Sequence, residues 1–169
     1  NDKAIVQDNS IREDSTPEKL AKLKPIFDRQ TGTVTAGNSS QVTDGAVALL
    51  VGSEAAAARL GIEPLGRLVS YAYAGCDPAR MGLGPVHAIA LAKERCGLAP
   101  DDADVIELNE AFATQVLAVL AALRKPESPG AIDEEKLNRQ GGAVALGHPV
   151  GASGARLVLT ALHQLRATG

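Results

Sequence analysis

Apolar residues recur at helical spacing in three long stretches of the chain. Pro85 stands where a first helical turn would begin and Gly97 where a last turn would end, which predicts a helix between them. A second helix is predicted from Phe112 to about Arg124, and a third from Ala155 to Leu165. We therefore expect helices to provide much of the architecture.

Two shorter helices are indicated by capping signals. Ser15 and Glu18 fit a capping box with Pro17 in the first turn, which predicts a helix that begins there. Ser53 can cap an alanine-rich helix that closes at Gly61. Both helices are expected to be short.

Four short segments are predicted to be strands, of which the first is a continuous apolar run and the second alternates weakly. They cover residues 46–51, 65–73, 104–108 and 141–146. A polar connection containing proline and glycine is expected over residues 125–140. Because strands alternate with helices, the pattern predicts an α/β fold built on a layered sheet.

Composition narrows the function classes. The chain has 169 residues, of which 45% are apolar and 22% charged, so it is long enough for one ordinary domain with a core. A net charge of −3 and only two Phe, two Tyr and no Trp argue against a nucleic-acid partner, which needs a basic or aromatic surface. No apolar run approaches the roughly 20 residues of a membrane span.

The cysteines and the chain ends carry further expectations. Cys76 and Cys96 are too few for a disulfide framework or a four-cysteine zinc site, so we expect no metal and a cytoplasmic or otherwise reducing compartment. The sequence begins with Asn1 in place of Met and ends at Gly169 directly after a helix pattern. We expect it to be a piece of a longer protein.

The most informative segment for chemistry is the glycine-rich turn from Gly147 to Gly154. It contains His148, whose unperturbed pKa lies near neutrality, at the end of a predicted strand and the start of a helix. That edge of an open α/β sheet is where ligands bind, so His148 is a candidate acid, base or oxyanion donor. Two alternatives stay open: the turn holds a phosphate, or His148 is only a hydrogen-bonded turn residue.

A second candidate pair, Asn109 and Glu110, follows the predicted strand that ends at Leu108. Asn109 is either the cap of the next helix or, together with Glu110, a group that orients a water or a carbonyl. Phe112 fits a core position by its spacing.

Four blocks together resemble the thiolase family, which cleaves or condenses 3-ketoacyl-CoA. They occur in the family's order and span nearly the whole chain: Thr35 to Ser40 followed by Asp44-Gly45-Ala46, Met81 to Val86, Asn109 to Ala113, and Gly147 to Gly154. One block alone would be a weak signal, whereas four in order are specific.

The resemblance implies a thiolase-like fold with five layers, α/β/α/β/α, of which this chain is an incomplete C-terminal half. Residues 1–42 then form the end of a CoA-binding loop domain. Residues 43–64 form the last strand and helix of the N-terminal half. Residues 65–169 form the C-terminal domain, truncated before its final strands.

The resemblance also assigns roles to individual residues. His148 resembles the catalytic histidine, which activates a nucleophilic thiol, and Asn109 the residue that holds a water. The histidine and that water form an oxyanion hole for the thioester oxygen. Six further positions resemble substrate-binding residues of the family. Ala36 and Ser40 resemble residues that contact pantetheine, and Phe27 resembles a residue of the loop domain that contacts CoA. The lining of the acyl and pantetheine pocket is resembled by Met81, Ala111 and Phe112.

The resemblance further implies CoA as a substrate, no permanently bound cofactor and a homodimer or homotetramer. It places a nucleophilic and an acid/base cysteine outside this chain, and neither Cys76 nor Cys96 is expected to replace them. The length and polarity of residues 125–140 favour the β-oxidation type. The competing hypothesis is a non-catalytic acyl-CoA or lipid-binding module with the same fold.

Overall fold

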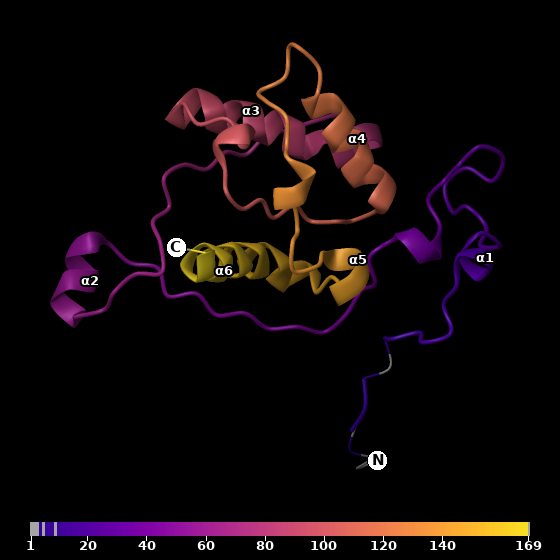
Figure 1. Ribbon diagram of the computed structural model, residues 1–169, viewed down its shortest axis with the longest axis horizontal. Helices are drawn as coiled ribbons and strands as arrows, with labels where there is room; N and C mark the ends of the chain where they lie inside the picture. Colours follow the sequence, from indigo (N-terminus) through magenta and orange to yellow (C-terminus); the bar gives the residue numbers. More distant parts are fainter. Residues whose placement is uncertain (1–3, 5, 9, 169) are drawn as a thin grey trace. The chain divides into compact units, whose positions relative to one another are not determined.

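The computed structural model of the chain describes residues 4, 6–8 and 10–168 and divides into two compact units (Figure 1). Unit 1 runs from Asn1 to Gly37 and unit 2 from Asn38 to Gly169. The expectations about Asn1 and Gly169 lie outside the described residues.

Unit 1 begins its regular structure at α1 (Pro17–Leu20). The side chain of Thr16 caps this helix by accepting a hydrogen bond from the Lys19 N–H at 3.3 Å. The predicted cap, Ser15, is therefore wrong by one residue. Because Pro17 occupies the first helical position, where its missing N–H loses nothing, the residue directly before it becomes the cap.

The rest of unit 1 folds back on α1 through close contacts. The Ile26 N–H donates to the Val34 carbonyl at 2.9 Å and closes a loop. A Cβ atom on Gly37 would lie 2.7 Å from Leu20 Cδ2 and 2.8 Å from Leu23 Cδ1. Only glycine lets the backbone pass so close to these two leucines.

Asp28 organises that loop and makes its stability depend on pH. Its carboxylate accepts hydrogen bonds from the Thr31 hydroxyl and from the backbone N–H groups of Gln30 and Thr31. The Thr31 hydroxyl, and then the two N–H groups, lower the pKa of Asp28 below its ordinary value.

We expect the Asp28 loop to loosen on acidification. A carboxyl whose pKa is lowered by folding stabilises the fold above its ordinary pKa, and this contribution is lost as the pH falls through the lowered value. The amide NMR signals of Gln30 and Thr31 should therefore shift together in that acidic range. Signals that move only at the ordinary carboxyl pKa would contradict the prediction, and Asp28→Asn, which does not titrate, is the control.

Unit 2 is built around two helices that lie side by side, α3 (Gly84–Cys96) and α4 (Ala113–Leu123) (Figure 1). They enclose a small core with two loop segments, and its buried members are Leu108, Val119, Leu120, Leu123 and Ile132. The described residues also contain four short 3-10 segments, η1 (Ala36–Asn38), which begins in unit 1, and η2 (Pro78–Leu83), η3 (Pro100–Asp102) and η4 (Glu134–Lys136) in unit 2.

Three of the helix ends predicted in unit 2 are confirmed. The Ser53 side chain accepts from the Ala56 N–H at 3.2 Å and begins α2 (Glu54–Leu60). Gly61 ends α2 with φ 63°, and Gly97 ends α3 with φ 77°. Both glycines adopt the left-handed conformation that closes a helix.

Most of the strand predictions are wrong. In the described part of the chain only two isolated bridges form, an antiparallel one between Ser39 and Phe112 and a parallel one between Ile106 and Leu137. Residues 46–51 and 65–73 form no strand, and Leu50 is 86% exposed. A strand exists only with a partner for its backbone groups, and the described residues offer these runs none.

The fourth predicted strand, residues 141–146, is wrong in kind. It contains a helix, α5 (Ala143–Leu146), and α6 (Val150–Thr168) begins soon afterwards. The glycine-rich turn is therefore shorter than predicted, because α6 already includes its second half. A short apolar run without alternation fits a buried helix turn as well as a strand.

The described residues lack a membrane-spanning helix and a cluster of metal-binding side chains. They contain no helix long and apolar enough to cross a bilayer. They also hold no group of three or more His, Cys, Asp or Glu side chains arranged to bind a metal ion.

Candidate active site

One extended segment of unit 2, residues 39–41, connects the blocks that the sequence singled out. The Ser40 N–H and hydroxyl both donate to the Ala111 carbonyl, at 3.0 and 3.2 Å. On the other side, the His148 N–H donates to the Gln41 carbonyl at 2.7 Å. Three predicted site residues, Ser40, Ala111 and His148, are thus brought together by backbone hydrogen bonds.

The turn that carries His148 packs tightly against the next residues of that segment. Gly147 has φ 93°, and a Cβ there would lie 2.5 Å from Thr43 Cγ2. A Cβ on Gly45 would lie 2.5 Å from Pro149 Cγ. An open groove of about 470 Å³ lies beside this turn, between residues 43–47 and the start of α6.

The imidazole of His148 is oriented by Ser153 on the first turns of α6. Its Nδ1 lies 2.6 Å from Ser153 Oγ, and the hydroxyl donates its proton to the Pro149 carbonyl at 3.1 Å. Because that single proton is already used, Ser153 accepts from Nδ1–H. Ser153 is buried, and because Nδ1 is engaged by it, Nε2 is the ring nitrogen available to exchange a proton with a substrate.

Asn109 presents an unpaired polar atom. Its Oδ1 is buried and has no hydrogen-bond partner among the described residues. The helix α4 begins at Ala113 with Phe112 as its cap, so the interpretation of Asn109 as a helix cap is wrong. A buried amide oxygen without a donor is costly, and a water or a ligand is the usual remedy.

Glu110, the other member of that pair, is fully engaged by protein groups. Its Oε1 accepts from Asn138 Nδ2 at 2.8 Å, and its Oε2 accepts from the Val144 N–H of α5 at 3.2 Å. Glu110 therefore caps α5, and of the two residues only Asn109 keeps a side-chain oxygen without a partner among the described residues.

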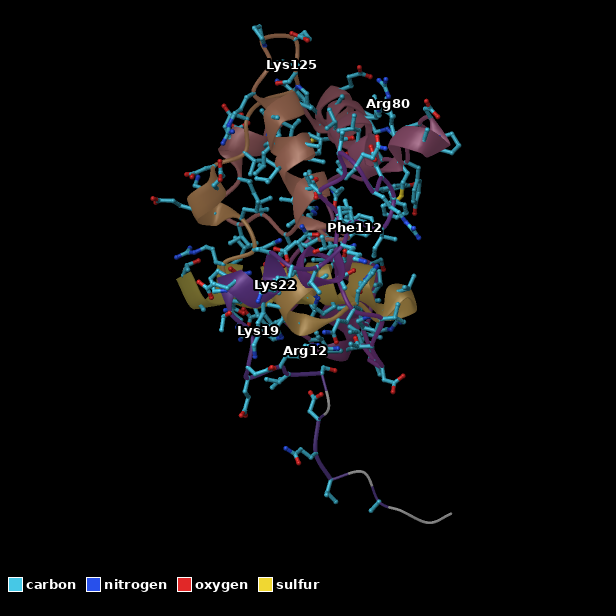
Figure 2. The ribbon with its side chains drawn as sticks, turned by 90° about the vertical axis from the view of Figure 1, so that its right-hand side faces the viewer. Arg12, Lys19, Lys22, Arg80, Phe112 and Lys125 are labelled. Atoms are coloured by element: carbon cyan, nitrogen blue, oxygen red, sulfur yellow. The ribbon has the colours of Figure 1, made fainter. Side chains whose placement is uncertain are left out.

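Two of the predicted substrate-binding residues flank the start of α4. Met81 lies on η2 and is 58% exposed, and Gln115 Nε2 anchors that segment by donating to the Gly82 carbonyl at 3.3 Å. Phe112 (Figure 2) occupies the position that precedes α4 and is half-buried. The core position that its spacing predicted is therefore wrong.

The remaining substrate-binding predictions fall in unit 1. Phe27 is 74% exposed, and Ala36 is the first residue of η1. The structure describes each unit by itself, so the contacts of Phe27 and Ala36 with the substrate remain predictions.

The sequence left the supporting residues unassigned. Ser153 lies inside the glycine-rich block five residues after His148, and its place in that block was the available signal. Asn138 lies in the polar connection; it has φ 46°, a conformation that Asn tolerates better than most residues. Cys76 and Cys96 are free; Cys76 lies beside the first residue of α3 and Cys96 is its last.

Comparison with known proteins identifies the relatives of this chain. Residues 62–169 match the family model described as "Thiolase, C-terminal domain", and residues 1–55 match "Thiolase, N-terminal domain". A 3-ketoacyl-CoA thiolase of Marinobacter nauticus is 50% identical over 167 residues, which cover 99% of this chain and 42% of that protein. The peroxisomal 3-ketoacyl-CoA thiolase of Homo sapiens is 48% identical over 165 residues, covering 98% of this chain and 37% of that protein.

A solved structure gives the same result. The crystal structure of human mitochondrial 3-ketoacyl-CoA thiolase in complex with CoA superposes with a TM-score of 0.85 at 47% identity, covering 96% of this chain and 39% of that one. The chain thus spans about two fifths of the length of these relatives. The matches to both family models and to relatives near 50% identity show that the chain belongs to the thiolase family.

Proposed function

We propose that this chain provides part of the active site of a thiolase-type acyltransferase. The reaction is thiolytic cleavage of a 3-ketoacyl-CoA to acetyl-CoA and a shortened acyl-CoA, or the reverse Claisen condensation. The observation that carries the proposal is the segment at residues 39–41, hydrogen-bonded to Ala111 on one side and to His148 on the other. The names of the relatives support the same reaction class.

His148 moves the proton in this proposal. Its unprotonated Nε2 takes the proton of a cysteine thiol, and the thiolate attacks the 3-keto carbon of the substrate. The bond between C2 and C3 breaks, and acetyl-CoA leaves as an enolate that a second cysteine protonates at carbon. The thiolate of CoA then takes the acyl group from the enzyme. Both cysteines belong to family segments outside this chain.

Asn109 supplies the second half of an oxyanion hole. A water that donates one proton to Asn109 Oδ1 has its other proton free for the thioester oxygen of the substrate. Protonated Nε2–H of His148 is the other donor. Negative charge builds up on that oxygen when the enolate forms, so both donors act more strongly in the transition state than in the ground state.

The finer assignments complete the proposal. Ala36 and Ser40 contact pantetheine, Met81, Ala111 and Phe112 line the acyl pocket, and Phe27 contacts CoA from the loop domain. This domain covers residues 1–42, with residues 43–64 and 65–169 in the two thiolase halves. CoA is a substrate and no cofactor is permanently bound. The enzyme is a homodimer or homotetramer of the β-oxidation type; its compartment, cytoplasmic or otherwise reducing, stays a prediction.

The test is thiolysis by the complete polypeptide, with acetoacetyl-CoA and longer 3-ketoacyl-CoAs as substrates. We expect CoA-dependent loss of the 3-ketoacyl compound and formation of acetyl-CoA. A folded protein that cleaves none of them would defeat the proposal. If such a protein still binds CoA, the non-catalytic acyl-CoA-binding module is the better account.

Ser153→Ala is expected to lower kcat about tenfold with little change in KM, because the freed imidazole samples the wrong tautomer and orientation. Steady-state kinetics of thiolysis measure this effect. Ser53→Ala is the matched control, since it removes a hydroxyl that caps α2. The control should destabilise the fold by about 1 kcal/mol and leave kcat unchanged. Equal kcat losses in both variants would contradict an orienting role for Ser153.

A further inference from the structure

Glu110 joins the two halves of the candidate oxyanion site. It follows Asn109 directly in the chain, and its carboxylate binds the start of α5 through the Val144 N–H at 3.2 Å. The last residue of α5, Leu146, leads directly into Gly147 and His148. One side chain therefore links the backbone of Asn109 to the short helix that delivers His148.

Both partners of Glu110 are hydrogen-bond donors whose orientation is fixed. Asn138 Oδ1 accepts from the Leu108 N–H at 2.8 Å, while its Nδ2 donates to the Leu108 carbonyl and to Glu110 Oε1, each at 2.8 Å. The amide of Asn138 therefore cannot turn its oxygen toward Glu110. Val144 offers a backbone N–H, which can only donate.

This arrangement requires two acceptors on residue 110. A deprotonated carboxylate provides them, whereas a glutamine provides one acceptor and one NH2 group. The NH2 group would face a donor at either Asn138 or Val144, and one contact would be lost. Glu110→Gln is therefore a sharp probe despite the nearly identical size of the two side chains.

Space around the carboxylate is equally restricted. A Cβ on Gly142 would lie 1.9 Å from the Glu110 carboxyl carbon and 2.1 and 2.2 Å from its oxygens. Gly142 has no positive φ, so an alanine there would strain nothing but this contact. The absence of a side chain at Gly142 is what admits the carboxylate to the cap of α5.

We propose that Glu110, held by Asn138 and admitted by Gly142, is a positioning residue that sets the separation between the Asn109 amide and the His148 imidazole. Asn138 serves as its fixed donor. The expected effect on turnover rests on the proposed function. The effect of Glu110 on the distance between Asn109 and His148 does not. A donor displaced by about 1 Å from its productive place can lower turnover about 10²-fold.

The matched control is Glu107→Gln. Glu107 lies three residues before Glu110, and its buried side chain accepts from Gln164 Nε2 at 2.6 Å and pairs with Arg156 at 3.6 Å. Those partners lie on α6 beyond the His148 turn, so the same chemical change there perturbs a buried carboxylate without touching α5.

The experiment uses thiolysis kinetics and crystal structures of the complete polypeptide and its variants. Glu110→Gln should lower kcat about 10²-fold with KM changed less than about threefold, and should alter the distance from Asn109 Oδ1 to His148 Nε2. Gly142→Ala should likewise lower kcat and alter this distance. In the double variant with Glu110→Asp the carboxylate is withdrawn by one methylene, which should restore part of kcat. Glu107→Gln should lower Tm but leave kcat and the distance unchanged.

Two results would overturn the inference. The first is an unchanged Asn109–His148 distance in both Glu110→Gln and Gly142→Ala. The second is a kcat loss in Glu107→Gln as large as in Glu110→Gln, which would mean a general loss of stability. A parent protein without thiolysis activity would defeat the proposed function, while the crystallographic distance would still decide the positioning role.

Discussion

Replacing His148 with alanine is expected to reduce thiolysis about 10⁴-fold in kcat while the protein remains folded. The variant loses the base that deprotonates the nucleophile, a contribution of about 10²–10⁴-fold, and one of the two oxyanion donors, worth about 10²–10³-fold. The two effects overlap because one ring performs both. The His148 side chain is only half-buried and its main contact is with Ser153, so we expect a small change in Tm.

The other two histidines of the chain provide the controls for this experiment. His87 lies on α3 and His163 on α6, and both are exposed. His87→Ala and His163→Ala should each leave kcat/KM within about twofold of the parent, as surface substitutions generally do. Activity that survives in His148→Ala, or falls equally in all three variants, would show that the assigned role is wrong.

Replacing Asn109 with alanine is expected to lower kcat about 10²–10³-fold, because the bound water that donates to the thioester oxygen loses its anchor. Asn109→Asp should be no better, since a carboxylate would place a negative charge beside the oxygen on which charge develops. Single-turnover kinetics with a 3-ketoacyl-CoA separate this effect from substrate binding.

The stability of the Asn109 variants distinguishes chemistry from packing. Asn109 Oδ1 makes no hydrogen bond to the described residues, so its removal takes no protein hydrogen bond away. Asn109→Ala should therefore keep the parent Tm or exceed it. A lower Tm with an unchanged kcat would mean that Asn109 only supports the fold.

Helices proved more predictable than strands because their signals are local. Ser53, Gly61 and Gly97 mark helix ends by their own backbone and side-chain preferences, and the structure confirms all three. A strand depends on partners that a sequence pattern does not specify. The apolar run at residues 46–51 indicates a segment suited to burial, yet Val51 is 85% exposed because nothing among the described residues pairs with it.

The misassigned residues 141–146 show how tertiary contacts decide a short element. Four residues are too few for helix propensity to act by itself. The Val144 N–H in the first turn of α5 is satisfied by Glu110, more than thirty positions earlier in the chain. The sequence of residues 141–146 alone therefore could not predict this helix, because the carboxylate that caps it lies elsewhere in the chain.

The candidate site was predictable to the extent that its motifs are contiguous. His148 and Asn109 stand in recognisable blocks, and backbone hydrogen bonds through residues 39–41 join their neighbourhoods. Asn138 was hidden in a polar connection that resembles an ordinary loop. Its importance depends on a left-handed φ and on three hydrogen bonds to residues 108 and 110, which only the folded chain reveals.

The most direct test of the central claim is a crystal structure of the complete polypeptide with acetyl-CoA bound. We predict that the thioester oxygen lies within hydrogen-bond distance, about 2.6–3.2 Å, of His148 Nε2 and of a water held by Asn109 Oδ1. A thioester oxygen bound by other groups, with His148 and Asn109 directed away from it, would contradict the account.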